Sequence, residues 1–107
     1  MAQYFISYIG GDHPSTPDEG RKHMVKYMGW LSSLGEAAIS PMNPLADTKT
    51  VNPDGSVTDG GISAMSGYTI IETDTLDSAL DLAKSCPFLN IGGSLEVSEL
   101  IQMPEPK

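Results

Sequence analysis

One predicted helix carries three side chains that could act together on a small molecule. His23, Tyr27 and Trp30 stand at positions i, i+4 and i+7, and this spacing puts them on one face of a helix. An imidazole titrates near neutral pH, so His23 could be a general acid or base in a pocket lined by the two aromatic rings. The same pattern also fits a partly exposed histidine beside two rings that fill the core or a subunit interface.

Asp59 is the second candidate for chemistry, in the loop sequence Asp-Gly-Gly. A carboxylate beside His23 would fix the imidazole tautomer, so we predict these two residues as a catalytic pair. Asp before Gly is also common in turns, where the carboxylate bonds to nearby backbone N–H groups. Tyr8 and Tyr68, on two predicted strands, complete the predicted ligand contacts together with the two aromatic residues of the helix.

Other motifs point away from cofactors and metals. The glycine pairs at 60–61 and 92–93 lack the spacing of phosphate-binding loops. Cys86 falls near the end of a predicted helix, where the partial negative charge raises a thiol pKa, so we expect a buried packing residue. Asp12 and His13 show no recognised ligand spacing. We therefore predict no cofactor and no metal.

The first third of the chain predicts a strand followed by a helix. Residues 2–9 alternate with mostly apolar side chains on both faces, as in a strand. Thr16 as N-cap, Pro17 in the first turn and Glu19 closing a capping box begin a helix, which Gly35 ends in a left-handed conformation. The apolar stripe of this helix is expected at Met24, Tyr27, Met28, Leu31 and Leu34.

The middle of the chain predicts a short strand and a small hairpin. Gly29, inside the helix, indicates either close backbone packing or simple tolerance of glycine there, and we favour close packing. Residues 36–42 fit a second strand, limited by Pro41 and Pro44. Residues 51–57 place Asn-Pro-Asp-Gly between two valines, a turn sequence that predicts a projecting hairpin.

The second half repeats the order of strand, helix and strand. Residues 68–72 are a β-branched and aromatic strand, and residues 94–101 form the last strand. Asp74 is the expected N-cap of the helix between them, and Pro87 ends it. Its apolar stripe is predicted at Leu76, Ala79, Leu80 and Ala83.

The order of elements predicts the fold class. Strand, helix, strand, strand, helix, strand is the α+β, ferredoxin-like βαββαβ unit, with both helices on one face of an antiparallel sheet. We expect one domain over residues 1–107, with the hairpin as a small addition. The opposite sheet face would be bare and partly apolar, so we predict a homodimer through this open face.

Composition narrows the classes of partner and the location. The 107 residues include 6 Lys and Arg against 14 Asp and Glu, a formal net charge of -8. Such a charge repels a phosphate backbone or an anionic membrane surface, so we expect neither nucleic acid nor membrane as a partner. A single cysteine and the lack of a basic and apolar leader favour a cytoplasmic location.

Three segments of the second half resemble one family. They are VTDGG at 57–61, SGYTIIETDTLDSALDLAKSCPFL at 66–89 and GGSLEV at 92–97. In this order they resemble the DGPF-type branch of the YCII-related family. The resemblance implies a ferredoxin-like fold that forms a dimeric α/β barrel, with a pocket between sheet and helices. The family is similar to chlorohydrolase-like and muconolactone-isomerase-like proteins, although most of its members have no assigned reaction.

The resemblance also bears on the site residues. Related proteins carry a histidine on the first helix, where His23 stands, and an aspartate before a proline after the second helix. Here that second position is Cys86, so only half of the pair is kept. The Asp-Gly of the DGPF motif is kept at 59–60, but its Pro-Phe is replaced by Gly-Ile at 61–62.

Two functions follow as hypotheses. The first is a cofactor-free small-molecule enzyme, a lyase, isomerase or hydrolase, with His23 as acid or base and Asp59 assisting. The second is a non-catalytic dimeric module that binds a small metabolite or regulates another process. A third possibility is a structural partner in a larger assembly, which predicts no bound ligand.

Overall fold

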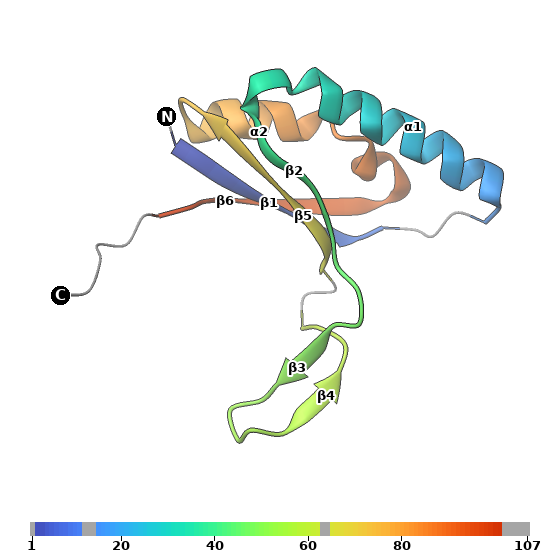
Figure 1. Cartoon of the computed structure of the whole chain (residues 1–107), viewed down its shortest axis with the longest axis vertical. Helices are drawn as coiled ribbons and strands as arrows, with labels where there is room; N and C mark the ends of the chain where they lie inside the picture. Colours follow the sequence, from blue (N-terminus) through green and yellow to red (C-terminus); the bar gives the residue numbers. More distant parts are fainter. Residues whose placement is uncertain (1, 12–14, 63–64, 102–107) are drawn as a thin grey trace.

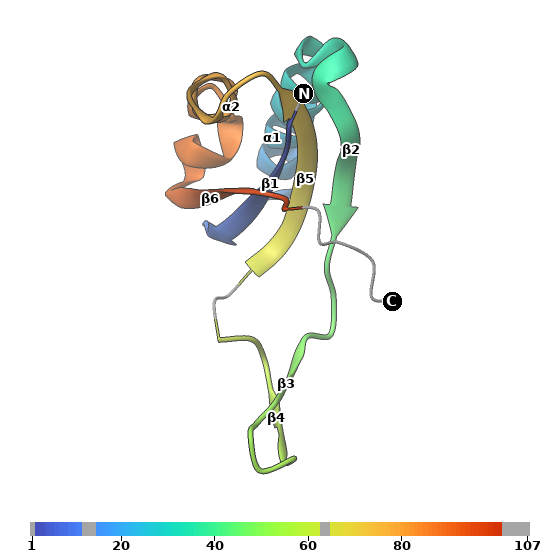
Figure 2. The same cartoon turned by 90° about the vertical axis from the view of Figure 1, so that its left-hand side faces the viewer.

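Two α-helices lie against one face of a four-stranded antiparallel sheet, and a two-stranded hairpin extends away from it, within the residues described (Figures 1 and 2). The computed structural model describes residues 2–11, 15–62 and 65–101. The elements in chain order are β1 (Ala2–Gly10), α1 (Pro17–Ser33), η1 (Gly35–Ala37), β2 (Ala38–Pro44), β3 (Lys49–Val51), β4 (Val57–Asp59), β5 (Met65–Thr73), α2 (Leu76–Lys84), η2 (Pro87–Ile91) and β6 (Gly93–Glu99). Asp12 and His13, considered above as metal ligands, lie outside the described residues.

The strand order of the main sheet is β2-β5-β1-β6, with every neighbouring pair antiparallel. Leaving the hairpin aside, this is the order of a βαββαβ unit in which the first and third strands occupy the centre. The predicted α+β class, with an antiparallel sheet and helices on one face, is confirmed.

The central strands β1 and β5 follow the predicted alternation. Tyr4, Ile6 and Tyr8 of β1 are buried beneath the helices, together with Thr69 and Ile71 of β5. Side chains between these positions point to the other side, which we call the open face. On it, the ring of Phe5 stacks on that of Tyr68 with centroids 4.8 Å apart. No element of the described chain covers this face in Figure 2.

The start of α1 forms as the sequence predicts, with one change. The Thr16 hydroxyl accepts a hydrogen bond from the Glu19 backbone N–H at 3.1 Å, and Pro17 is the first helical residue. The Glu19 carboxylate accepts from the backbone N–H and hydroxyl of Ser15 instead of closing on Thr16, and these bonds lower the pKa of Glu19. The helix ends at Ser33, just before Gly35 with a φ of 55°.

The buried stripe of α1 is confined to its C-terminal end. Trp30, Leu31 and the C-cap residue Leu34 are buried, whereas Met24 and Met28 are 49% and 45% exposed, so the predicted stripe is wrong in its first half. The helix packs closely on the sheet only in its last turns. The idea of close packing at Gly29 is also wrong, because an added Cβ there would meet no atom within 4 Å.

The second helix begins one residue later than predicted. The Thr75 hydroxyl, not the Asp74 carboxylate, caps α2 by accepting a hydrogen bond from the Ser78 N–H at 3.1 Å. Within the predicted stripe, Ala79 and Ala83 are buried, but the two leucines at 76 and 80 are partly exposed. Small residues therefore bring α2 close to the sheet.

Strand β2 is an edge strand, which explains how it holds two prolines. It begins two residues after the predicted start, and its pairing with β5 shifts register twice. The amide of Asn43 donates to the backbone oxygens of Ser40 at 3.0 Å and Tyr68 at 3.2 Å, which fastens the irregular part of β2 to β5.

The predicted hairpin is present as β3 and β4. Thr50 pairs with Thr58, and the turn between the strands contains Gly55 with a φ of 88°. The hairpin projects from the main sheet in both views (Figures 1 and 2). Among the described helices, none is long and apolar enough to cross a membrane.

Candidate functional site

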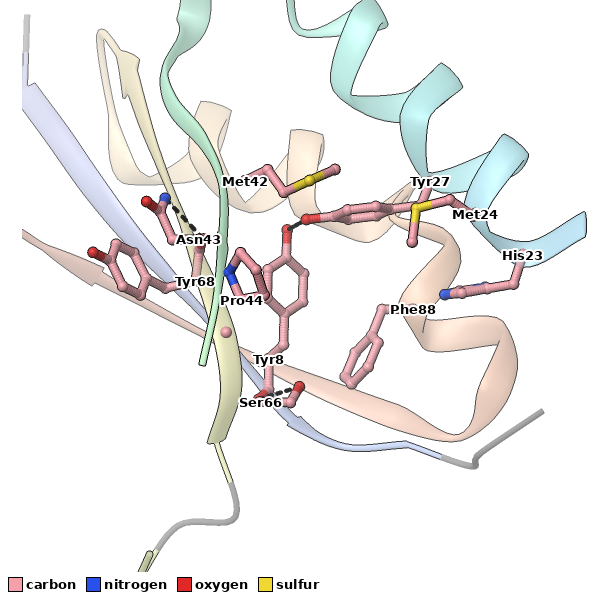
Figure 3. Close-up of a pocket in the computed structure, with 11 residues that line it drawn as sticks. Tyr8, His23, Met24, Tyr27, Met42, Asn43, Pro44, Ser66, Tyr68 and Phe88 are labelled. Carbon is pink, nitrogen blue, oxygen red and sulfur yellow. Dashed lines mark hydrogen bonds between the residues drawn. The ribbon is translucent and has the colours of Figure 1, made fainter. Parts of the chain in front are cut away.

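A cavity of about 240 Å³ lies between α1, the end of β2 and the adjoining ends of β1 and β5. Figure 3 shows its lining residues. The walls are mainly apolar: the thioethers of Met24 and Met42 and the rings of Tyr8, Tyr27 and Phe88 contribute to them. The polar groups of the lining are His23, the tyrosine hydroxyls, Asn43 and Ser66.

The hydroxyl groups of Tyr8 and Tyr27 meet at the cavity (Figure 3). The Tyr27 hydroxyl donates to that of Tyr8 at 2.9 Å, and Tyr8 also bonds to the hydroxyl of Thr69 at 2.5 Å. The Thr69 hydroxyl donates in turn to the backbone oxygen of Pro41 at 2.6 Å. We call these three hydroxyls and the carbonyl the hydroxyl chain. Burial raises the pKa of Tyr8 far above its usual value, so this phenol stays protonated.

His23 lies on α1 at one side of the cavity, with its ring toward Phe88 in Figure 3. Its ring is nearly parallel to that of Tyr27, with an angle of 14° and centroids 6.5 Å apart. The side chain is half-buried. Among the described residues, no Asp or Glu lines the cavity.

Phe88 forms one wall of the cavity, and sequence reasoning missed it. Its ring meets that of Tyr8 edge-on, with centroids 5.3 Å apart and an angle of 72°. The ring fits against two glycines: a Cβ at Gly93 would lie 2.2 Å from it and a Cβ at Gly11 would lie 2.9 Å from it. The glycines therefore leave the space that Phe88 occupies.

Tyr8, Tyr27 and His23, all predicted as site residues, are brought together here. Tyr68 borders the cavity, but its ring lies on the open face against Phe5. Figure 3 shows that ring on the far side of β5 from Tyr8.

Trp30 lies outside the cavity, in the core between α1 and α2. It is 6% exposed, and its indole N–H donates to the backbone oxygen of Leu82 at 3.0 Å and to the hydroxyl of Ser85 at 3.1 Å. Its ring also packs beside Tyr27, with centroids 6.1 Å apart. Trp30 therefore fills the core, as the alternative interpretation of the helix pattern predicted, and does not line the cavity.

The structure does not bring Asp59 together with His23 within one chain. Asp59 is in β4 of the hairpin, its side chain is 90% exposed, and its carboxylate pairs with Lys49 of β3. It is absent from the cavity lining. Over the described residues, no group of three or more His, Cys, Asp or Glu side chains is placed to hold a metal ion.

Comparison with known proteins identifies the fold. The chain is similar to 5-chloro-2-hydroxyhydroquinone dehydrochlorinase from Burkholderia phenoliruptrix AC1100, solved in complex with 2,5-dihydroxybenzoquinone, with a TM-score of 0.51 and 16% sequence identity. The match covers 94% of this chain and 95% of the other. At this identity the likeness concerns the fold, and it supports the ferredoxin-like α+β architecture expected from the sequence. No family model matches the chain, and no curated protein matches its sequence.

Proposed function

We propose that the cavity binds a flat, uncharged molecule with a single ring or two fused rings. The observation that carries this proposal is the combination of apolar walls with His23 and the Tyr27 hydroxyl in one space of about 240 Å³. Ligand sites are typically apolar, with a few polar groups that fix orientation, and this volume is at the small end of their range. The excess of acidic residues in the chain disfavours an anionic ligand.

The chemistry we propose is cofactor-free proton transfer by His23. A neutral imidazole could remove a proton from the bound ring or its hydroxyl and return it elsewhere, as a lyase, isomerase or hydrolase requires. The similar solved structure supports a small-molecule enzyme, since that protein is a dehydrochlorinase bound to a six-membered-ring compound. We also retain membership in the DGPF-type branch of the YCII-related family as a proposal.

We propose a homodimer through the open face. Phe5, Tyr68 and Ile70 are only half-buried there in one chain, and a second sheet would cover them. The predicted partnership of His23 with Asp59 would then need the hairpin of a second copy. We propose that this dimer is a dimeric α/β barrel and that it is located in the cytoplasm.

A non-catalytic binding module is the second candidate. The observation that favours it is the lack of a carboxylate among the described cavity residues, because His23 would then act without a partner that fixes its tautomer. Such a module would bind ring compounds and convert none of them.

Thermal melting in the presence of phenol, hydroquinone or indole tests the proposal, since a ligand that binds the folded state raises the melting temperature. We expect at least one probe to stabilise the protein, and His23→Ala to weaken that effect. The matched control is Lys26→Ala, an exposed position of α1 outside the cavity. No stabilisation by any probe would contradict the proposal. Turnover of 5-chloro-2-hydroxyhydroquinone, lost in His23→Ala, would decide for the enzyme over the module.

A further inference from the structure

The hydroxyl chain has only one arrangement of protons that satisfies all its members. The backbone oxygen of Pro41 can only accept, so the Thr69 hydroxyl must give its single proton to it at 2.6 Å. Thr69 then has only lone pairs left for Tyr8, which must donate across the 2.5 Å contact. The proton of Tyr27 completes the series by pointing at the oxygen of Tyr8, 2.9 Å away.

The Tyr27 oxygen is therefore left with free lone pairs and no free proton. None of the described residues donates a hydrogen bond to it, and Tyr27 lines the cavity. Figure 3 shows its hydroxyl directed at Tyr8. A ligand can satisfy this oxygen only by donating to it.

We infer that Thr69 is a positioning residue that makes Tyr27 a pure hydrogen-bond acceptor, so the cavity selects rings that carry an O–H or N–H donor over rings that carry only acceptors. This inference rests on the proposed binding function of the cavity. Thr69 acts through Tyr8 and Tyr27, because it is absent from the cavity lining.

Burial keeps the direction of the chain fixed. Thr69 is 0% exposed and Tyr8 is 5% exposed, so water does not compete for the Thr69 proton, and the Pro41 oxygen stays its acceptor. In the reversed order the Pro41 oxygen, in an exposed residue of the edge strand, would lose its 2.6 Å bond from Thr69, and the loss of a hydrogen bond is unfavourable. Ionisation of Tyr8 would also disrupt the order, but burial raises its pKa.

Indole and quinoline test the inference directly. Both are flat two-ring molecules, but indole offers only an N–H donor and quinoline, neutral at pH 7.5, offers only a ring-nitrogen acceptor. We expect indole to bind the wild-type protein about fivefold more tightly, the difference expected for one hydrogen bond, as measured by ligand-observed NMR titration.

Thr69→Val keeps the shape of the side chain but removes its hydroxyl. Tyr8 then loses its acceptor and can donate to Tyr27 instead, which frees the Tyr27 proton for the ligand. We expect the preference to move toward quinoline by at least about fivefold, while Thr69→Ser keeps the wild-type ratio. His23 is unchanged in every variant, so its own bonds to either probe do not account for a change in ratio.

The outcomes separate this inference from the proposed function. Equal binding of both probes by the wild type, or an unchanged ratio in a folded Thr69→Val protein, would overturn the role of Thr69 and leave the binding cavity standing. Absence of binding by either probe would overturn the proposed function and this inference with it. If Thr69→Val does not fold, Tyr27→Phe replaces it: the inference requires the preference for indole to disappear, and a persisting preference overturns it.

Discussion

Gly67→Ala should destabilise the protein by forcing the edge strand away from the cavity. Gly67 lies on the buried face of β5, opposite Pro44 of β2. A Cβ at this position would be 2.9 Å from the backbone oxygen of Asn43 and 3.4 Å from the Cα of Pro44. Backbone atoms cannot rotate away as a side chain can, so β2 must shift.

The size of the effect follows from what that shift disturbs. It would strain the β2–β5 pairing and the bond from the Leu45 N–H to the Ser66 oxygen, now 2.9 Å. Overpacking of this kind typically costs about 2 kcal/mol, which lowers Tm by roughly 10 °C in a domain of this size. Because β2 carries Met42 and Pro44 in the cavity wall, probe binding should weaken as well.

Gly29→Ala is the matched control with the opposite sign. Gly29 is inside α1 with no atom within 4 Å of an added Cβ, so alanine gains helix propensity without a clash. Stability should rise by roughly 0.5–1 kcal/mol. Thermal and urea unfolding followed by circular dichroism measure both variants. A Gly67→Ala protein as stable as Gly29→Ala would refute the account of the β2–β5 contact.

Two further predictions concern the neighbourhood of η2. Gly93→Ala should displace the Phe88 ring, because the added Cβ would lie 2.2 Å from it. We expect the aromatic NMR signals of Phe88 to change more than those of Phe5. A smaller change at Phe88 than at Phe5 would contradict this prediction. Burial raises the pKa of the Cys86 thiol to about 11, above the ordinary value of roughly 8.5. The folded state therefore holds this proton more tightly than the unfolded state. The contribution of the protonated thiol to the free energy of unfolding is fully present below pH ~8.5 and is lost as pH rises through about 11. The free energy of unfolding, measured with urea at several pH values, should therefore fall less steeply with rising pH for Cys86→Ala than for the wild type. The same dependence on pH in both proteins would argue against this account.

Local signals in the sequence predicted the framework of the fold. The alternation in β1 and β5 and the Thr16-Pro17 start of α1 depend on neighbouring residues alone, and all are found in the structure. Thr75 was missed as a cap because Asp74 beside it is the more strongly preferred N-cap type. The exposure of Met24 depends on how far α1 extends along the sheet, which local spacing does not reveal.

The site was only partly predictable because distant segments build it. Helical spacing identified His23 and Tyr27, but it could not tell a cavity residue from a core residue, and Trp30 proved to be the latter. Thr69 is an ordinary strand residue in the sequence, and its bond to Tyr8 joins positions 61 residues apart.

Two other residues illustrate the same limit. Phe88 follows a Cys-Pro sequence that suggests only a helix stop, although the glycines that accommodate its ring are visible in the sequence. Asp59 was paired with His23 on chemical grounds, whereas the hairpin holds it on a separate small sheet.

The location of a bound ring tests the central claim most directly. With ¹³C-labelled methionine methyl groups, Met24 and Met42 report on the cavity, and Met28, on α1 but outside the lining, is the internal control. On titration with indole we expect the Met24 and Met42 signals to shift and to show contacts to indole protons, while Met28 stays unchanged. Contacts at Met28 with none at Met24 and Met42, or no shifts at saturating indole, would contradict a ligand site in this cavity.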